Sequence, residues 1–449
     1  MNARALLVIA ALVALVGGGY MAAGRFEGTP PSVVAPEQLV VGKAGATLSI
    51  EIEDPASGLR ELSIRLLHEA GSQPLSDHSW PGGLIEGGLP GGRTASIEIE
   101  IDPVAQRLPD GKATLVISVR DWSWRDGFSG NRTELSVPVV IDTRPPRVSV
   151  QSGLTYVYRG GSAAAVYRVD SDVPVHGIRV GNTFFPGHPH PADADAHIAL
   201  FAIPVDAASD PLVEVVAADE AGNEDSVRFP ARVIERQFAK SQIDIDETFI
   251  ARVAAPLART AGLPVVGPSE TFRGVNEELR ARNERMIRER VQDGAARPLW
   301  SGAFTQLAGS KVMSRFAEHR TYNLGGRKIS QARHFGFDLA STTAARITAA
   351  NAGVVIFAED LGIYGNCVIV DHGLGLATLY GHLSQIEVET GQSVAQGDVL
   401  GRSGISGLAA GDHLHFATLV GGTYVDPLEW WDPKWVRTHV GVRLDPSPR

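Results

Sequence analysis

A run of twenty uncharged residues, from Ala5 to Gly24, constrains this chain more than any other feature of its sequence. At 1.5 Å per helical residue, about twenty residues cross a bilayer core of about 30 Å. Arg4 and the α-amino group precede the run, so the positive-inside rule places the N-terminus in the cytoplasm. The sequence therefore predicts a membrane-directed segment over residues 1–24, followed by an exported remainder.

A cleaved secretory signal peptide is the alternative interpretation of this segment, because Met21-Ala22-Ala23 offers small residues for cleavage. The apolar run is longer than the core of about 7–15 residues that is typical of a signal peptide, which favours an uncleaved anchor. We therefore expect a single-pass protein of the inner (cytoplasmic) membrane, with the bulk of the chain on the periplasmic or extracytoplasmic side.

Composition and charge narrow the function of the exported part. The chain has 449 residues, 44% of them hydrophobic, which is enough for two to four domains with cores of their own. Its 41 Lys and Arg against 51 Asp and Glu give a net charge of −10, which argues against nucleic acid as a partner. Cys367 is the single cysteine, so a disulfide within the chain and a cysteine-based metal centre are excluded. Any metal must be bound by histidines and carboxylates.

Residues 31–143 and 144–235 form two β-rich modules that look like repeats. Runs such as Thr47–Glu53 have apolar side chains at every second position, which predicts strands. Near the end of each module a strand leads to Asp121 or Asp219, then to a turn closed by Gly-Asn, then to a last strand. This pattern resembles the bacterial immunoglobulin-like domains found in tandem on exported proteins. The resemblance implies two immunoglobulin-like β-sandwiches that are suited to binding a protein partner.

The second module also contains a histidine-rich stretch that invites a metal-site interpretation. It includes His188, His190 and His197, with Asp193 and Asp195 between them. Prolines stand on both sides of His190, and the stretch lacks the periodicity of a strand. We interpret it as a solvated loop rather than a metal site.

The spacing of apolar residues changes in residues 239–296. From Pro268 onward, apolar residues recur at mostly helical spacing among many charges. Glu278 and Arg282 form one of two oppositely charged i,i+4 pairs. The segment is predicted to be a helical connector between the β modules and the last domain, with its charges on a solvated face.

Residues 300–433 carry the residues on which chemistry depends. His334 and Asp338 alternate with apolar neighbours, and on a straight strand they would lie about 13 Å apart. Gly336 between them permits a kink that brings both toward one centre. Strand geometry also places His413 and His415 on one face, so that one imidazole suits a metal and the other suits a bound water.

A third element, Tyr380-Gly-His382, ends another strand. Two histidines and one aspartate make a three-ligand zinc set that leaves the fourth tetrahedral position open to water, which is typical of catalytic zinc. The order of these elements predicts a hydrolytic zinc site.

At this point the sequence resembles the lysostaphin-type zinc endopeptidases, which cut the peptide part of peptidoglycan. The resemblance covers about residues 310–427 and rests on His334-Phe-Gly-Phe-Asp338-Leu-Ala, Thr378-Leu-Tyr-Gly-His382-Leu and Gly411-Asp-His413-Leu-His415-Phe416. It implies an antiparallel-β peptidase domain with one zinc ion. By resemblance the zinc ligands are His334, Asp338 and His415, the general base is His413, and His382 is a second catalytic histidine that stabilises the polarised carbonyl.

The sequence departs from the family before the first ligand. The family usually has Ser-x-Phe-Gly before an arginine, whereas this chain has Ser314-Arg-Phe316-Ala317 before Arg320. We expect the alanine to alter a loop at the rim of the substrate groove without touching a ligand.

The expected fold is mainly β, with two immunoglobulin-like sandwiches, a helical connector and a C-terminal peptidase domain. The expected function is zinc-dependent hydrolysis of peptide crosslinks in peptidoglycan during cell-wall remodelling, with peptidoglycan stem peptides as substrate. Two alternatives stay open. One is a non-enzymatic scaffold or activator of other cell-wall hydrolases, and the other is a zinc peptidase that acts on a non-murein protein.

Overall fold

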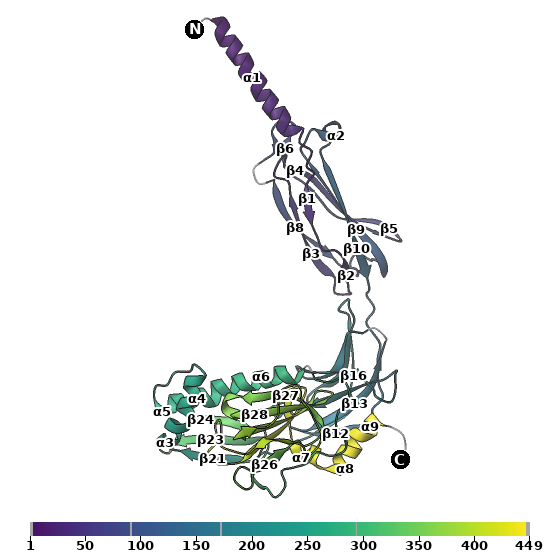
Figure 1. Ribbon diagram of the computed structural model, residues 1–449. Coiled ribbons are helices and arrows are strands. Elements are labelled where there is room, and N and C mark those ends of the chain that lie inside the picture. Colours follow the sequence, from purple (N-terminus) through teal and green to yellow (C-terminus); the bar gives the residue numbers. More distant parts are fainter. Residues whose placement is uncertain (1–2, 90–91, 171–172, 293, 446–449) are drawn as a thin grey trace. The chain divides into compact units, whose positions relative to one another are not determined.

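The structure is a computed structural model that describes residues 3–89, 92–170, 173–292 and 294–445. Strands make up most of its regular structure, which confirms the predicted mainly-β fold. Contacts divide the chain into two compact units. The first unit is Met1–Pro146 with Ala218–Glu224, and the second is Arg147–Ala217 with Asp225–Arg449 (Figure 1). The division into five domains stays a prediction.

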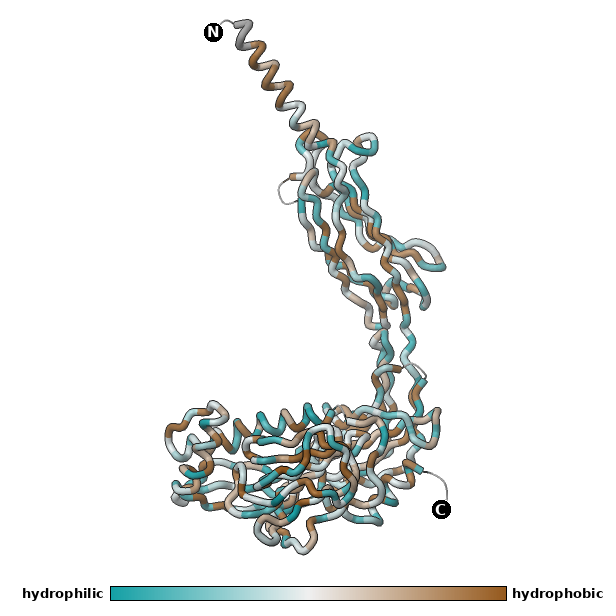
Figure 2. The backbone as a smooth tube through the Cα atoms, in the orientation of Figure 1, coloured by the Kyte–Doolittle hydropathy of each residue, from teal (hydrophilic) through white to brown (hydrophobic). Residues whose placement is uncertain are grey.

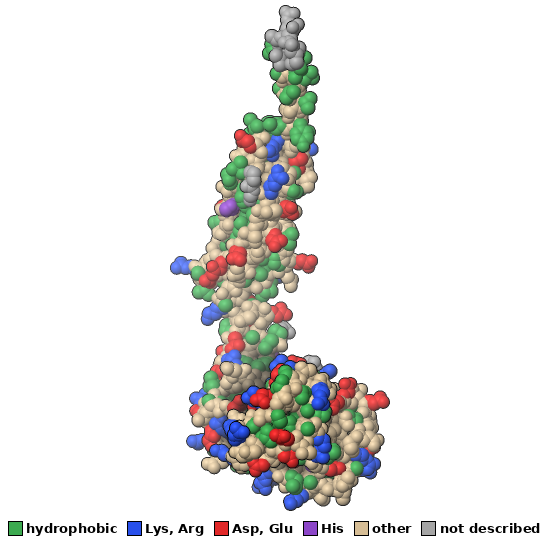
Figure 3. Space-filling model, turned by 90° about the vertical axis from the view of Figure 1, so that its left-hand side faces the viewer, with side chains coloured by type: hydrophobic (Ala, Val, Ile, Leu, Met, Phe, Trp, Pro, Cys, Tyr) green, Lys and Arg blue, Asp and Glu red, His purple; other side chains and the backbone are tan. Residues whose placement is uncertain are grey.

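The N-terminal segment forms one helix, α1 (Ala3–Arg25). By length and composition, its stretch Leu7–Arg25 is apolar enough to cross a membrane. Leu7 and Val16 are each 70% exposed, and Figures 2 and 3 show apolar residues along the part of α1 whose side chains are described. Such a continuous apolar surface is unfavourable in water, which suits a helix that lies in lipid. Met1 and Asn2 of the predicted segment lie outside the described residues.

The first β module is a sandwich of two sheets over one apolar core. Its strands alternate buried apolar and exposed polar residues, as in β3, where Leu48, Ile50 and Ile52 are buried. The smaller sheet has the order β1 (Ser32–Val34), β3 (Ala46–Glu53), β8 (Thr94–Ile101). The larger sheet has the order β2 (Leu39–Val41), β10 (Arg132–Ile141), β9 (Gly111–Asp121), β4 (Leu59–His68), β5 (Gly71–Ser79). The loops of the module contain the short strand pair β6 (Gly82–Gly83) and β7 (Gly87–Gly88) and the turn α2 (Arg125–Phe128).

The second β module follows the same architecture. One sheet has the order β11 (Val148–Val150), β13 (Ser162–Val169), β17 (His197–Ala202), β16 (His188–Pro189). The other has the order β15 (Thr183–Pro186), β14 (Val175–Val180), β18 (Val213–Ala218), β19 (Glu224–Arg228). A parallel pair, β12 (Thr155–Tyr158) with β20 (Ala231–Ile234), completes the module.

The predicted solvated loop in this module is confirmed for residues 191–195, which lie in turns and are largely exposed, but it is wrong for the three histidines. His188 lies in strand β16, His197 opens strand β17, and His190 is 6% exposed. The Nε2 atom of His190 lies 2.6 Å from the carbonyl oxygen of Arg443, which is distant in sequence. Because Arg443 is so distant in sequence, no local pattern around His190 could predict that this histidine is buried.

The connector segment begins with a strand rather than a helix. Lys240–Ile245 forms β21, in which partly buried Ser241, Ile243 and Ile245 alternate with exposed residues, the period of a strand. Helical segments follow at α3 (Glu247–Phe249), η1 (Ile250–Ala254), α4 (Ala255–Thr260), α5 (Pro268–Arg273), η2 (Gly274–Leu279) and α6 (Arg280–Gln292). The helix expected from Pro268 is therefore present, and in Figure 1 α6 runs along strand β27.

The C-terminal region is built on a large antiparallel sheet. Its order is β22 (Lys311–Ser314), β25 (Phe337–Ala340), β33 (Leu414–Val420), β29 (Leu376–Leu383), β28 (Asn366–Gly373), β27 (Gly353–Asp360), β31 (Ser393–Val394), with β34 (Thr423–Val425) on β33. All residues of β29 and β33 are buried, because other elements cover both faces of the sheet. These strands therefore give a rigid base to any side chain at their ends.

Smaller elements complete the region. A second sheet consists of β21, β23 (Glu318–Leu324) and β24 (Arg327–His334), and a third of β26 (Arg346–Thr348), β32 (Val399–Arg402) and β30 (Gln385–Ile386). The remaining short segments are η3 (Gly362–Tyr364), α7 (Pro427–Trp431), α8 (Pro433–Trp435), η4 (Val436–Gly441) and α9 (Val442–Leu444).

Candidate metal centre and groove

His334 and Asp338 come from two successive strands that belong to different sheets. His334 is the last residue of β24, and Asp338 is the second residue of β25. The chain changes direction at Phe335-Gly336, and the His334 Nε2 atom lies 3.0 Å from Oδ1 of Asp338. A Cβ atom on Gly336 would lie 2.6 Å from Cε1 of His415 and from the carbonyl oxygen of Phe416. A glycine is therefore required where the two strands meet.

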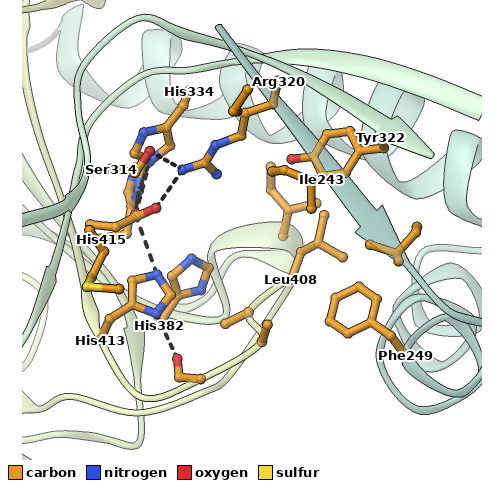
Figure 4. Close-up of a pocket in the computed structure, with 18 of the residues that line it drawn as sticks. Ile243, Phe249, Ser314, Arg320, Tyr322, His334, His382, Leu408, His413 and His415 are labelled. Carbon is orange, nitrogen blue, oxygen red and sulfur yellow. Dashed lines mark hydrogen bonds and ion pairs between the residues drawn. The ribbon is translucent and has the colours of Figure 1, made fainter. Parts of the chain in front are cut away.

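His415 reaches the same point from strand β33. Asp338 and His415 are direct partners in the antiparallel pairing of β25 with β33. The Nδ1 atom of His415 lies 3.1 Å from Oδ1 of Asp338 and 3.0 Å from Nε2 of His334. All three residues are less than a tenth exposed. The structure thus brings together the three predicted ligands (Figure 4).

The donor set fits a zinc ion. With bonds of about 2.0–2.1 Å, the ligand atoms of a tetrahedral zinc lie about 3.3 Å apart, close to the separations of 3.0–3.1 Å here. Nδ1 of His334 lies 3.1 Å from the carbonyl oxygen of Arg315, so this nitrogen carries the proton and Nε2 of the neutral ring offers a lone pair. Burial lowers the pKa of His415 to about 4, which keeps that ring neutral. Lone pairs therefore converge from three sides, as a cation requires.

Two further histidines face this cluster. His413, just before β33, places Nδ1 2.7 Å from the carbonyl oxygen of Gly411 and Nε2 3.4 Å from Oδ1 of Asp338. His382, near the end of β29, places Nδ1 2.8 Å from the carbonyl oxygen of Ser406. The two ring centroids lie 4.8 Å apart. Because each Nδ1–H is donated to a carbonyl, Nε2 is the nitrogen of each ring that can gain or lose a proton.

The two rings differ in their electrostatics. Burial lowers the pKa of His413, but the hydrogen bond and charge of Asp338 outweigh that effect and raise it above its usual value. Burial, together with the nearby rings of His413 and His415, lowers the pKa of His382 to about 3. His382 is therefore neutral around pH 7.

An arginine and its partners hold the second oxygen of Asp338. Arg320 donates from Nη2 to Oδ2 of Asp338 at 2.7 Å and to Oγ of Ser314 at 2.7 Å. Its Nε lies 3.2 Å from Oε2 of Glu318, which also accepts from Ser314. Sequence reasoning noted Ser314 and Arg320 only as part of a family pattern and did not assign them this function. The sequence pattern that could have indicated this function is the placement of Glu318, Arg320 and Tyr322 at every second position of β23, which puts them on one side of the strand.

Ala317 occupies a position that the sequence analysis placed at the groove rim. The structure instead buries it completely, and its N–H donates to the carbonyl oxygen of His334 at 2.7 Å. Its φ of 60° lies in the left-handed region that favours glycine. The family glycine is thereby explained, since this residue fixes the backbone of a ligand rather than the shape of the rim.

The cluster lies in a groove of about 740 Å³. The four labelled histidines line one side, and Ile243, Phe249 and Leu408 line the side that faces them (Figure 4). Ile243 lies in β21, and Phe249 ends α3. Sequence reasoning assigned both to the connector and missed them, because a wall made from a distant segment has no motif of its own.

Comparisons with known proteins point to the same region. Residues 332–427 match the family model for Peptidase family M23. A segment of 95 residues is 37% identical to DD-carboxypeptidase/endopeptidase Mpg of Neisseria meningitidis, covering 21% of this chain and 22% of that protein. A segment of 119 residues is 33% identical to peptidoglycan DD-endopeptidase ShyA of Vibrio cholerae, covering 26% of this chain and 27% of that protein.

Among solved structures, the catalytic domain of lysostaphin from Staphylococcus simulans is 26% identical. That match covers 28% of this chain and 96% of the lysostaphin domain, with a TM-score of 0.24. The chain spans only about a fifth to a quarter of the length of the curated relatives named above.

The fold and the His-Asp-His cluster define the class of a metallopeptidase domain. More narrowly, the C-terminal region carries a lysostaphin-type domain of peptidase family M23, which confirms the resemblance seen in the sequence. The three proposed ligands and both further histidines lie within the matched residues 332–427.

Proposed function

We propose that this protein is a zinc-dependent endopeptidase that hydrolyses peptide crosslinks of peptidoglycan during cell-wall remodelling. The observation that carries the proposal is the convergence of His334, Asp338 and His415 at the groove, with two further histidines beside them. The names of the Neisseria and Vibrio relatives describe DD-endopeptidase activity, in the second case on peptidoglycan, which supports the choice of substrate.

His334, Asp338 and His415 would hold the zinc, which when bound supplies a Lewis acid and lowers the pKa of a coordinated water. His413 is placed to take the proton of the attacking water, because its Nε2 atom faces Oδ1 of Asp338 at 3.4 Å. Arg320 holds Oδ2 of the aspartate and fixes the direction in which Oδ1 points.

His382 stabilises the oxygen of the scissile carbonyl. Its Nδ1–H is donated to the carbonyl oxygen of Ser406, so only a protonated Nε2 can donate a hydrogen bond to that oxygen. Since the free ring is neutral, this function requires His382 to take up a proton during the reaction.

Helix α1 supports a proposed location in the membrane. A single-pass anchor of this length would hold the protein in the inner (cytoplasmic) membrane, with the bulk of the chain on the periplasmic or extracytoplasmic side. Stem peptides of peptidoglycan are then within reach, and the two β modules are surfaces on which a protein partner can bind.

Digestion of purified peptidoglycan tests the proposal. Full-length protein in detergent should convert crosslinked muropeptide dimers into monomers, and a chelator should stop the reaction. His415→Ala should lose both bound zinc and activity, whereas His413→Ala should keep zinc, measured by mass spectrometry of the metal, and lose turnover. His439, which is partly buried and stacks on Trp435 outside the cluster, is the control: its replacement by Ala should change neither zinc content nor turnover.

Each alternative predicts a different outcome of the same assay. A scaffold or activator would leave the dimers intact whether or not it binds zinc. A zinc peptidase with a non-murein substrate would cleave a general protein substrate and leave the dimers intact. Wild-type turnover in His413→Ala would overturn the assigned base.

A further inference from the structure

Three carboxylates meet in the first unit, outside the peptidase domain. Glu27 follows helix α1, Asp54 follows β3, and Asp121 ends β9. One oxygen from each of the three lies within 4.8 Å of the others. Asp54 is 2% exposed and Asp121 is fully buried. Like charges brought together at such distances repel strongly unless something neutralises them.

One buried oxygen of the group has no partner. Oδ1 of Asp54 accepts hydrogen bonds from the N–H groups of Ala56 and Ser57, at 2.9 and 3.0 Å. Oδ2 of the same side chain is buried and has no hydrogen-bond partner. Leaving a carboxylate oxygen buried without a partner is costly, so a ligand for it is expected here.

The amide of Asn131 is surrounded by more acceptors than it can satisfy. Its Nδ2 lies 2.8 Å from Oδ2 of Asp121, 3.0 Å from Oε1 of Glu27, 3.3 Å from the carbonyl oxygen of Glu27, and 3.4 Å from that of Thr29. An amide NH₂ group has two hydrogens, so at least two of these four oxygens depend on another donor or cation. Two of them have a second donor, because Ser57 donates from Oγ to Oε1 of Glu27 at 2.8 Å and Nε of Arg125 lies 3.4 Å from the carbonyl oxygen of Glu27.

The corresponding turn of the second repeat is balanced and serves as an internal comparison. There Nδ2 of Asn223 faces Oδ2 of Asp219 and the carbonyl oxygen of Asp142, both at 2.9 Å. Two hydrogens meet two acceptors, so an Asp–Asn pair alone is enough to fix the incoming chain. The first repeat adds the carboxylates of Glu27 and Asp54 to such a pair.

Within the part of the chain that the structure describes, Glu27, Asp54 and Asp121 form no ion pair with Lys or Arg. Two arginines that are close to these carboxylates in the sequence, Arg25 and Arg125, donate to backbone carbonyls instead. Arg25 faces the oxygens of Ile85, Glu86 and Ser57, and Arg125 faces those of Phe26 and Glu27.

We propose that Glu27, Asp54 and Asp121 bind a calcium ion. The cluster offers only oxygen ligands, both carboxylate and carbonyl, and calcium accepts six to eight oxygens at about 2.3–2.6 Å with tolerant geometry. The ion links the segment that leaves α1, through Glu27, to the loop after β3 and to the end of β9. It thereby fixes the first β module to the residues that follow the membrane helix.

Calcium titration of the full-length protein in detergent tests this site. After treatment with a calcium chelator, the protein should bind one calcium ion by calorimetry, with an affinity that is weakened at least about tenfold in Glu27→Gln and in Asp54→Asn. Asp110→Asn is the matched control, because Asp110 lies in the same module but pairs with Thr143 and Arg144. Its calcium affinity should equal that of the wild type.

A second measurement tests where the calcium ion binds. Cleavage by trypsin after Arg25 should slow on addition of calcium in the wild type and in Asp110→Asn, but not in Glu27→Gln. If Asp54→Asn does not fold, Glu27→Gln decides alone, since Glu27 is only partly buried. Absence of calcium binding by the wild type, or unchanged binding in Glu27→Gln, overturns the proposal.

Discussion

Arg320 donates a hydrogen bond to Oδ2 of Asp338 at 2.7 Å, while Oδ1 of the same carboxylate faces three histidines. The guanidinium therefore determines how a ligand is oriented without touching the metal position. Outer partners of this kind orient metal ligands and thereby tune metal affinity.

Replacement of Arg320 by Lys should weaken zinc binding by about 10–100-fold. The lysine keeps the charge but lacks the planar fork that reaches Asp338, Ser314 and Glu318 together. Competition with a chromophoric zinc chelator measures the effect. Arg327→Lys, an exposed change on the neighbouring strand, should leave the zinc affinity as it is.

Replacement of Gly336 by Ala should disrupt the ligand set by steric contact. The added Cβ would lie 2.6 Å from Cε1 of His415 and from the carbonyl oxygen of Phe416, so His415 must move. A ligand displaced by a fraction of an ångström should lower turnover by about 10²-fold, measured with purified peptidoglycan. Gly153→Ala has open space around its Cβ and should leave turnover unchanged.

Replacement of Ala317 by Gly should stabilise the protein. A non-glycine residue at a φ of 60° costs the folded state about 1–2 kcal/mol, and glycine would relieve this strain. The greater entropy of glycine in the unfolded state offsets about 0.5–1 kcal/mol of that gain. We expect a gain of about 0.5–1 kcal/mol in the free energy of unfolding, seen as a higher Tm.

The matched control for Ala317 is Ala349→Gly. Ala349 is also fully buried but is not among the residues with positive φ, so glycine there should lower the Tm. Equal losses at both positions would show that φ is not the source of strain at Ala317.

Glu429 should make stability depend on pH. It is 6% exposed, and its carboxylate accepts from the N–H of Ser162 at 2.8 Å. Burial raises its pKa from 4.5 to about 8, so the folded state holds a proton that the unfolded state releases. The stabilisation is complete below pH 4.5 and is lost as the pH rises through about 8.

Thermal unfolding between pH 5 and pH 9 measures this loss. The Tm of the wild type should fall with rising pH relative to that of Glu429→Gln, which cannot ionise but still accepts from Ser162. Glu389→Gln, at an exposed carboxylate, should follow the wild-type curve. Parallel curves for the wild type and Glu429→Gln would contradict the prediction.

The sequence predicted the parts of the site that depend on local spacing. His334 and Asp338 lie four residues apart around a glycine, and His413 and His415 lie two residues apart on a strand, so period and chain geometry bring each pair to one place. Their joint position could be expected only through the family resemblance, because the pairing of β25 with β33 spans more than seventy residues.

Features that rest on long-range contacts could not be predicted. His190 contacts a carbonyl more than 250 residues away, and β21 is a strand because β23 pairs with it.

His372 lies within the residues that match the family model but outside the candidate site. Its two nitrogens face the carbonyl oxygen of Ala352 and Oγ1 of Thr378, so it connects the ends of strands.

The pairing of β21 with β23 determines where this protein can be shortened. A fragment beginning at residue 300 would keep every proposed ligand but would leave the edge of β23 open to aggregation. It would also lack Ile243 and Phe249, and with them one wall of the groove. A fragment beginning at Arg147 preserves the second unit whole, including the buried contact between Glu429 and Ser162. A truncated protein for crystallography or assays should therefore begin at Arg147.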